Sequence, residues 1–444
     1  MTFQRWYARV AVSIVGVVAL AAGFVTIAAP PASAAPTCGT TASPLDSTIT
    51  DTPSSPAAGS LRAAVDGTDG DCSTVVLQAG ATYVLGSGSG CVELSIDNSM
   101  TIESSSTSQN ATIQQTCTSN FDGRVAHVSG GNTATLDNLT LTGGQQFNSG
   151  GALRSESSST LILNNDMLTG NRSDEDGGAI NSHGPLTVMN STISGNCAVD
   201  GGGGILLNSP TGATLIQNST ISGNAQGLDG GGAIENVSGA LTVNYVTLVN
   251  NTSSASPGCG TFADSAAQSL PGEPNDPVAH PGGVGAQAPV SVAVANLSLN
   301  NDEGADATLT SFGTVIGDIA ATSNNCALGG DTPTSAGYNY ENGGATPPTC
   351  GLNASTDVQS GADPNLGTLG ANGGPTNTQV PQTGSALINA IPDPGGGCPE
   401  SPVTITTDQR GITRPQGPGC EIGAVEVVVT APAAALTVTP SFTG

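Results

Sequence analysis

The amino-acid sequence predicts an all-β chain folded as a parallel β-helix, a solenoid of stacked coils. The first observation is a repeat, because LILNNDMLTGN, LTVMNSTISGN, TLIQNSTISGN and LTVNYVTLVNN follow one another at intervals of 25 to 28 residues. The second is the alternation of apolar residues, as in Leu186-x-Val188, which is the spacing of strands and not of helices. The third is a run of glycines closed by an aliphatic residue, which recurs in step as GGAL, GGAI, GGGGI and GGGAI.

Each copy of the repeat contributes one residue to several columns. The reference column holds Leu168, Ile193, Ile221 and Leu248, and the same frame extends back to Leu141 and forward to Leu299. Three residues before the references stand Asn138, Asn165, Asn190, Asn218, Tyr245 and Asn296, and three after stand Gly144, Asn171, Asn196, Asn224, Asn251 and Asp302. We expect the aliphatic columns to form the core and the Asn side chains to bond from coil to coil, ~4.8 Å apart. Thr214 interrupts the column of Leu161, Leu186 and Leu241, which predicts a local irregularity.

Composition narrows the choice of partners. The formal net charge is −26, and all eight basic residues are Arg. So acidic a surface argues against nucleic acid and anionic membranes as partners, and it fits divalent cations or a basic partner. Leu, Ile, Val and Phe make up about a fifth of the chain, a share that borders on disorder. The periodicity decides in favour of an ordered solenoid.

The N-terminus reads as a secretion signal over residues 1–34. Arg5 and Arg9 precede the apolar run 10–29, and Ala32-Ser33-Ala34 offers a small-x-small cleavage site. An uncleaved membrane anchor is the alternative, and after cleavage no span is expected. We therefore expect an extracellular location.

Cysteine usage agrees with export. All ten Cys lie beyond the signal, and an even count without a CxxC motif favours disulfides over a zinc site. Among the open pairings, the close pairs Cys326/Cys350 and Cys398/Cys420 are the simplest.

The chain divides into five predicted parts. In chain order they are the signal 1–34, an N-terminal cap 35–90, the β-helix 91–330 with a loop insertion at 252–289, a C-terminal cap 331–426, and a linker or tail 427–444. Within the N-terminal cap, Gly59–Val65 is expected to form a short amphipathic helix over the open first coil. The insertion is either a functional surface loop or plain disorder.

Three segments resemble known families. GGA[IL] paired with an apolar-x-x-Asn motif is similar to the repeat of polymorphic outer-membrane proteins, with Leu168, Ile193, Ile221 and Leu248 in place of its Phe. That resemblance implies a right-handed parallel β-helix on a cell surface, often adhesive. GSLRAAV resembles the CSLREAI element that precedes many such β-helices, although Gly59 replaces its Cys and Ala63 its Glu. Residues 363–426 resemble the choice-of-anchor Q domain, with Glu421 where Asp is usual and no LPxTG motif after it.

One acidic column is the candidate metal site. Asn148, Asp176, Asp200 and Asp229 each stand just before a Gly run, so that stacked coils would bring Asp176, Asp200 and Asp229 to one-coil spacing. Three interpretations are open: ordinary Asp-Gly turn chemistry, which we favour, a Ca²⁺ ladder, and a catalytic carboxylate pair. Asp66–Asp71 resembles a Ca²⁺ loop in composition only, so a solvated turn is favoured there.

The remaining charged residues favour structural roles. Arg410 and Arg414 stand near Asp408, Glu421 and Glu426 in sequence, which predicts an ion-pair cap. His127 lacks an evident partner in the sequence and is expected to be structural.

We expect a secreted or cell-surface β-helix that acts as a non-catalytic adhesive, structural or carbohydrate-binding module, a monomer with glycans or cell-surface molecules as partners. The alternative is a polysaccharide hydrolase or lyase. A lyase commonly needs Lys or Arg as base, and the repeats offer only Arg124, Arg154 and Arg172. No GxSxG, HExxH or P-loop motif occurs. We therefore assign no catalytic residue and no cofactor other than the candidate calcium.

Overall fold

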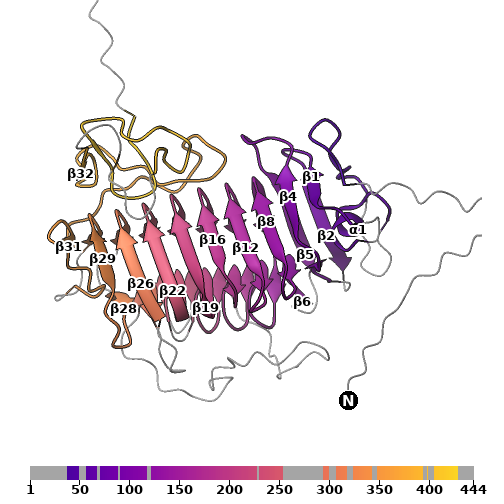
Figure 1. The fold of residues 1–444 in the computed structure, drawn as a ribbon, viewed down its shortest axis with the longest axis horizontal. Coiled ribbons are helices and arrows are strands. Elements are labelled where there is room, and N and C mark those ends of the chain that lie inside the picture. Colours follow the sequence, from indigo (N-terminus) through magenta and orange to yellow (C-terminus); the bar gives the residue numbers. More distant parts are fainter. Residues whose placement is uncertain are drawn as a thin grey trace, which may run out of the picture. The chain divides into compact units, whose positions relative to one another are not determined.

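The computed structural model shows an all-β parallel solenoid of about seven turns (Figure 1). It describes residues 38–49, 57–67, 71–88, 91–117, 122–227, 230–253, 294–299, 307–317, 324–342, 348–393, 398 and 405–428. These all belong to one compact unit, Pro36–Gly444. The only helix in the described ranges is α1, Leu61–Val65, and no described helix has the length and apolar content needed to cross a membrane. The predicted fold class is confirmed.

Three sheets form the walls of the solenoid, and their strands pair in parallel except for β6 (Asp122–Gly123) and β10 (Gln145–Gln146), which are antiparallel. Sheet 1 has 15 strands and takes two successive strands from each coil, sheet 2 has 10 strands, and sheet 3 has 6. The strands of sheet 1 are β1 (Thr74–Leu77), β3 (Leu94–Ile96), β4 (Met100–Ser104), β7 (Ala126–Val128), β8 (Thr133–Asp137), β11 (Leu153–Ser155), β12 (Thr160–Asn164), β15 (Ile180–Ser182), β16 (Leu186–Met189), β19 (Ile205–Gln217), β22 (Ile234–Asn244), β25 (Val294–Leu299), β26 (Ala307–Phe312), β28 (Asn324–Ala327) and β29 (Thr334–Gly337).

The other two sheets follow the same coil order. Sheet 2 contains β2 (Thr82–Gly88), β5 (Ala111–Cys117), β9 (Leu139–Thr142), β13 (Met167–Thr169), β17 (Thr192–Ser194), β20 (Thr220–Ser222), β23 (Thr247–Val249), β27 (Val315–Gly317), β30 (Tyr340–Asn342) and β31 (Val358–Gly361). Sheet 3 contains β6 (Asp122–Gly123), β10 (Gln145–Gln146), β14 (Arg172–Ser173), β18 (Cys197–Ala198), β21 (Ala225–Gln226) and β24 (Thr252–Ser253).

The core consists of the aliphatic columns that the repeat predicts. Leu168 pairs with Ile193, Ile193 with Ile221, and Ile221 with Leu248 in sheet 2, and all four side chains are buried. The residue that closes each Gly run forms a second column in sheet 1, Leu153, Ile180, Ile205 and Ile234. Because like side chains stack on like, the small number of aromatic residues does not prevent a dry core.

The Asn residues serve two structural purposes. Asn138, Asn165, Asn190, Asn218 and Tyr245 have φ between 46° and 58°, so the turn that they occupy needs the left-handed conformation that Asn tolerates. The second column is a buried amide ladder, in which Nδ2 of one Asn donates to Oδ1 of the next from Asn171 through Asn196, Asn224, Asn251 and Asn296 to Asn325, over 2.9–3.1 Å. Both roles are those predicted.

The predicted alignment of the repeat is wrong after the insertion. Leu248 pairs with Ile316 and not with Leu299, and Asn296 lies in the amide ladder and not in the left-handed turn column. The reason is that β25 takes the position of the Gly-run strand, with Leu297 beside Ile234. The spacing of 51 residues, close to two periods, is therefore coincidental. The predicted start of the insertion is wrong by two residues, because Thr252 and Ser253 form a strand of sheet 3, while residues 254–289 and Asp302 lie outside the described residues.

The irregularity predicted at Thr214 is present. Thr214 is buried between Leu186 and Leu241, and the pairing of β19 with β22 shifts register between Leu207 and Ala213. A Thr in an aliphatic column removes one apolar side chain from the core, and β19 is the strand in which two repeat positions merge.

The short helix expected at the N-terminal end is present as α1, but it is not amphipathic, because all five of its residues are buried. Ser60 caps α1 by accepting from the Ala63 N–H at 3.1 Å, and Leu61 packs into the core. Leu45 forms a bridge to Leu77 of the first strand, and a disulfide joins Cys38 to Cys72. The coils themselves begin within the predicted cap, at β1, and continue past residue 330 through β31.

A C-terminal block, residues 363–393, 398 and 405–428, lies against the outside of sheet 2 (Figure 1, yellow). It covers a column of outward threonines, Thr192, Thr220 and Thr247, which are register partners in β17, β20 and β23. Gln409 accepts from the Thr220 hydroxyl at 2.6 Å, and the Ala424 N–H donates to the Thr247 hydroxyl at 3.0 Å. The only strands of the block among the described residues are β32 (Ile391–Pro392) and β33 (Gly419–Cys420), which pair with each other. The block thus behaves as a side cover that long-range hydrogen bonds hold.

The disulfides suggested by proximity in sequence are confirmed. Cys326 is bonded to Cys350 and Cys398 to Cys420. Cys91 and Cys197 are also disulfide-bonded, and no described cysteine is free.

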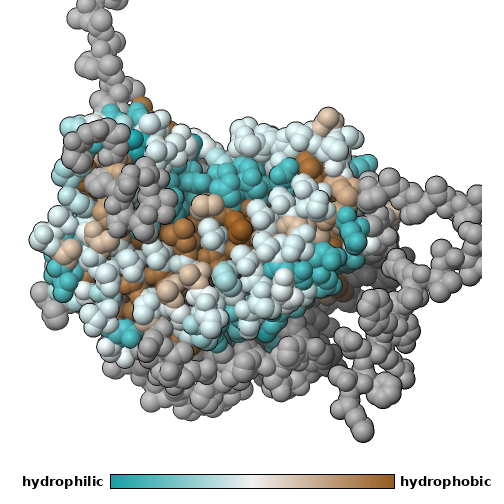
Figure 2. Space-filling view, in the orientation of Figure 1, coloured by the Kyte–Doolittle hydropathy of each residue, from teal (hydrophilic) through white to brown (hydrophobic). Residues whose placement is uncertain are grey.

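The net negative charge is not spread evenly over the surface. Figure 2 shows apolar side chains gathered in the middle of the face formed by the second strands of sheet 1. The outward residues there include the register partners Ile162, Thr187 and Leu215, and no outward position of β12 or β16 carries a charge.

Candidate functional site

The predicted acidic column is built around Asp176, which is buried in the turn before Gly177. Its carboxylate accepts from the Gly201 N–H of the next coil at 2.9 Å, and the side chain is only 2 % exposed. Burial raises the pKa of Asp176 well above its usual value, and the charges of Glu235 and Asp200 raise it further. Asp176 therefore holds a proton far more readily than an exposed carboxyl does.

Glu235 was not expected in this cluster. It projects from β22, is 1 % exposed, and reaches back toward the turns of earlier coils. A Cβ on Gly201 would lie 1.9 Å from Glu235 Oε2 and 3.1 Å from Asp176 Oδ1, so the sum, 5.0 Å, is the largest separation that these two oxygens can have. Glycine at 201 leaves the space that the Glu235 carboxyl occupies. The sequence feature that could have predicted this position is an acidic residue, Glu235, directly after the GGGAI run.

The column does not stack as the sequence suggested. The Asp200 N–H bonds to the Glu175 carbonyl, whereas Gly201 pairs with Asp176, so Asp176 and Asp200 are offset by one position. The coils pair Ile180 with Ile205, which are 25 residues apart, but only 24 residues separate Asp176 from Asp200. Asp200 is half-buried, and Asp229 lies outside the described residues. The structure therefore gathers Glu175, Asp176, Asp200 and Glu235 in one acidic cluster.

The acidic cluster could hold a proton or a divalent cation. Crowded carboxylates are relieved by protonation or by Ca²⁺, which takes six to eight oxygen ligands. The upper bound of 5.0 Å on the distance between Asp176 Oδ1 and Glu235 Oε2 lies at the lower limit of the carboxyl separation in retaining glycosidases, about 5–5.5 Å. Because both side chains are buried, a sugar ring has no access to the bond-breaking position between them. Calcium binding by Asp176, Asp200 and Asp229 remains a prediction.

A second charged cluster crosses the early coils on the outer side of sheet 1. His127 of β7 lies 3.0 Å from Glu156 and 3.5 Å from Glu93, while Arg124 also pairs with Glu93 and Arg154 lies 3.3 Å from Glu156. Burial opposes the charge on His127, but the hydrogen bonds to Glu156 and Glu93 raise its pKa to about 9. The hydrogen bond from His127 lowers the pKa of Glu156 to about 2. An imidazole held charged in this way is a structural cation at neutral pH and not a general base.

The sequence signal for this cluster was present but weak. His127 and Arg154 are register partners 27 residues apart, one coil spacing. His127 is structural, as predicted, although it has the partners that the sequence did not reveal.

The predicted ion-pair cap is confirmed in the C-terminal block. Arg410 lies 2.7 Å from Asp408, and Arg414 lies 2.6 Å from Glu426 and stacks over the Tyr245 ring at 4.4 Å from its centroid. Burial, and then the hydrogen bond to Glu426, raises the pKa of Glu421 to about 8. Both ion pairs lie within the block, and Arg414 also contacts the solenoid, at the Tyr245 ring and at Asn218 Oδ1.

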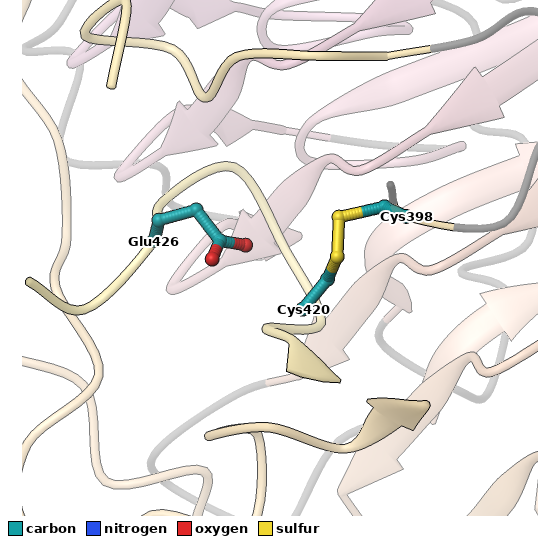
Figure 3. A group of neighbouring side chains, drawn as sticks. All are labelled: Cys398, Cys420 and Glu426. Carbon is teal, nitrogen blue, oxygen red and sulfur yellow. A yellow bond between two sulfur atoms is a disulfide. The ribbon is translucent and has the colours of Figure 1, made fainter. Parts of the chain in front are cut away.

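Cys398, Cys420 and Glu426 lie close enough together to suggest a metal centre (Figure 3). The two sulfurs are bonded to each other, so neither offers the thiolate that a metal requires. The Glu426 carboxylate accepts from Arg414 and from the Gln416 N–H. This group is therefore structural.

A groove of about 510 Å³ runs along sheet 3 and was not predicted. One wall is a single register column through five coils, Gln145, Arg172, Cys197, Ala225 and Thr252. The others of its ten lining residues are Gly170, Gly195 and Gly223, with the backbone and edges of Asn171 and Asn196. These three glycines have φ between 64° and 69°, and a Cβ on Gly223 would meet no atom within 4 Å. The turn that requires glycine thus also keeps the groove open.

No family model, curated protein or solved structure matches the chain. The resemblances in the repeats and the C-terminal block therefore remain predictions. The function must be inferred from the geometry of the sites.

Among the lining residues that the structure describes, Arg172 is the only charged one. It is half-buried, and burial lowers its pKa while Asp174 acts in the opposite direction. Arginine still carries its charge at neutral pH. Asp174, two residues further along the chain, is the acidic group whose charge acts on this guanidinium.

Proposed function

We propose that this protein is a secreted, surface-exposed β-solenoid that acts as a non-catalytic adhesive or carbohydrate-binding module. The observation that carries the proposal is the groove along sheet 3, whose wall repeats in register through five coils. A ligand lying along it meets nearly the same backbone geometry at each coil. A linear polymer of similar units suits such a site better than a compact small molecule.

The lining is suited to sugars in its chemistry. Gln145 and Thr252 offer an amide and a hydroxyl group at the two ends of the groove, and bare glycine backbone lies between them, which gives donors and acceptors beside small flat surfaces. Pyranose rings present the same mixture of hydroxyl groups and apolar edges. Export through residues 1–34, the right-handed coil and surface exposure belong to the same proposal, and the resemblance to polymorphic outer-membrane protein repeats supports them.

Catalysis is the alternative, with Asp176 and Glu235 as the carboxyl pair. Their proximity favours it and their burial argues against it. A glycan array and a reducing-sugar assay on plant and microbial polysaccharides separate the two proposals. Binding without release of reducing ends supports the module, whereas release that Asp176→Asn abolishes supports the hydrolase.

The groove can be tested by filling it. Thr252 is exposed at one end of the groove, so Thr252→Trp should block the groove without disturbing the core. Thr82→Trp, at an exposed strand position outside the groove, is the matched control. We expect glycan binding to fall at least tenfold for the first variant and to persist for the second. Equal binding by both variants would place the site elsewhere.

A further inference from the structure

Three buried carboxyl groups of the C-terminal block share two arginines. Asp408 pairs with Arg410 and Glu426 pairs with Arg414, and the third carboxyl is that of Glu421. Each of the three acidic residues is at most 1 % exposed. Because a buried carboxylate that lacks a cation is costly, the group is most stable when one of its carboxyls carries a proton.

The contacts of Glu421 identify the carboxyl that holds this proton. A hydrogen bond joins its side chain to that of Glu426, and two carboxyls can share a hydrogen bond only when one of them is protonated. Glu426 already accepts from the Arg414 guanidinium at 2.6 Å and from the Glu421 N–H at 3.0 Å. Glu421 accepts from the N–H groups of Asn389 and Val427, which carry no charge. Burial, and then Glu426, raises the pKa of Glu421 to about 8.

Arg414 connects this group to the solenoid. Its guanidinium lies over the Tyr245 ring, 4.4 Å from the centroid, and donates to the Gly423 carbonyl at 2.8 Å. The residue after Gly423, Ala424, donates its N–H to the Thr247 hydroxyl of sheet 2. The position of one guanidinium therefore affects both the carboxyl group and the docking of this segment.

The solenoid presents phenols to the group. They belong to Tyr245, under the guanidinium, and to Tyr338, whose charge acts on Tyr245. Burial raises the pKa of Tyr245 above its usual value of 10.0, so this phenol stays neutral at the pH values at which Glu421 titrates. From the block, Asp408 accepts from the Glu426 N–H and stays paired with Arg410.

We propose that the C-terminal block is a pH-sensitive cover of sheet 2, which docks tightly while Glu421 is protonated and loosens when Glu421 loses its proton. The proton passes to solvent and leaves two carboxylates side by side. An ionised Glu421 repels Glu426 and competes with it for Arg414, which draws the guanidinium away from Tyr245. The outward threonines of sheet 2 then become accessible.

The loosening is confined to part of the block. Leu387, Ile391 and Ile422 belong to an apolar cluster that also contains Tyr245 and Phe312 of the solenoid. These contacts do not change with pH, so the block stays tethered while the contacts of residues 405–428 open.

The range of pH follows from Glu421, whose pKa is about 8 in the docked block and 4.5 where the side chain is exposed. Below pH 4.5 the residue is protonated in both forms, so pH has no effect there. Between pH 4.5 and 8 only the docked form keeps the proton, so each unit of pH should favour the loosened form about tenfold. Above pH 8 the effect levels off.

Hydrogen exchange of the purified full chain at several pH values between these limits tests the proposal. After correction for the intrinsic pH dependence of amide exchange, protection across residues 405–428 should fall about tenfold per pH unit, while β16 and β17 stay protected. Glu421→Gln keeps the size of the side chain and cannot ionise, so its protection should not vary with pH. Asp363→Asn removes a carboxyl from an exposed position of the same block and should keep the wild-type slope.

Glu421→Ala is the second variant, because it removes the carboxyl without asking the site to accommodate an amide. It too should show protection that does not vary with pH. Wild-type protection that is constant between pH 4.5 and 8, or a slope that persists in both Glu421 variants, overturns the proposal. Equal loss of protection in β16 and β17 would mean that the whole solenoid responds to pH, and would also overturn it.

Discussion

At the scale of single residues, the buried asparagines add side-chain hydrogen bonds between the coils to the backbone bonds of the sheets. Asn196 accepts from both the backbone N–H and the side-chain amide of Asn171, and it donates to the Leu168 carbonyl and to Asn224. Each of these groups is shielded from water, so none can exchange its partner for solvent. Loss of one asparagine of the ladder therefore leaves buried hydrogen-bonding groups of the neighbouring coils without partners.

Asn196→Ala should lower the free energy of unfolding by about 1–3 kcal/mol, because it leaves buried donors and acceptors of the neighbouring coils unsatisfied. The matched control is Asn164→Ala. Asn164 also bonds from coil to coil, to Asp137 and Asn190, but it is half-buried and water can replace those bonds. Urea denaturation of both variants measures the difference. Equal losses would show that burial of the ladder contributes nothing of its own.

The charge cluster around His127 should stabilise the fold over a limited range of pH. The pKa of His127 is raised to about 9, so its contribution to stability is complete below its unfolded value of 6.5 and is lost as the pH rises toward 9. Burial raises the pKa of Glu93, but the opposite effect of Arg124 and His127 is larger and brings it down to about 2. The pKa of Glu156 is also lowered to about 2. Their contribution is complete above pH 4.5 and is lost as the pH falls toward 2.

The stability difference between the wild-type chain and His127→Gln should therefore be greatest between about pH 4.5 and 6.5 and should shrink on both sides. Thermal melts across this range measure it. His183→Gln, one coil further on, removes only a weaker effect of charge on Glu156 and should change the stability less. A difference that does not vary with pH would mean that the charge of His127 is not what stabilises the fold.

At the scale of elements, the C-terminal block depends on a few polar contacts with sheet 2. Gln409 is buried and donates to the Ser191 carbonyl and the Thr192 hydroxyl, while it accepts from Thr220. These partners lie about 190 to 220 residues earlier in the chain, so the contacts exist only when both parts are folded. The block can therefore stay docked only while the middle coils of the solenoid are folded.

Gln409→Ala should release the block before the coils unfold. The loss of buried hydrogen bonds costs about 1–3 kcal/mol of docking free energy, which should raise hydrogen exchange across residues 405–428 and leave β16 and β17 protected. Gln382→Ala, an exposed Gln of the same block, should have no such effect. Simultaneous loss of protection in block and coils would indicate one cooperative unit instead.

At the scale of the whole molecule, the acidic cluster sets how the chain responds to calcium. Like charges at one-coil spacing repel by roughly 1 kcal/mol even in water, and more when partly buried. Extracellular Ca²⁺ sites have dissociation constants of about 10⁻⁴–10⁻³ M, and tenfold saturation stabilises a fold by roughly 1.4 kcal/mol. Such a gain is large enough to appear as a shift in melting temperature.

Millimolar Ca²⁺ should raise the melting temperature relative to chelator, and Asp200→Asn should reduce that rise because Asp200 interacts with Asp176. Asp66→Asn tests the other acidic segment. Identical melts in Ca²⁺ and chelator would leave the cluster as turn chemistry with a buried proton. A rise that survives Asp200→Asn but not Asp66→Asn would move the site to residues 66–71.

The sequence by itself determined the solenoid, its aliphatic columns, the left-handed turns at Asn138 to Asn218 and the amide ladder. Parallel coils place equivalent residues one above another, so a period in the sequence is also a period in space. The ion-pair cap of Arg410 and Arg414 and the pairing of Cys326 with Cys350 were visible for a similar reason, since their partners are close in sequence.

Only the tertiary structure decided the features that depend on the length of individual turns or on distant partners. A difference of one residue in coil length separates Asp176 from Asp200 and brings Glu235 beside Asp176. The insertion before β25 changes which strand position resumes the coil, so Leu299 leaves the reference column. The groove is lined by residues of several different columns, and Gln409 bonds to Thr220 from a distant part of the chain, so neither contact follows from the period. The period of the sequence determines which residues stack on one another along the solenoid axis. The lengths of the individual turns, and segments that return from distant parts of the chain, determine which side chains from different columns come into contact.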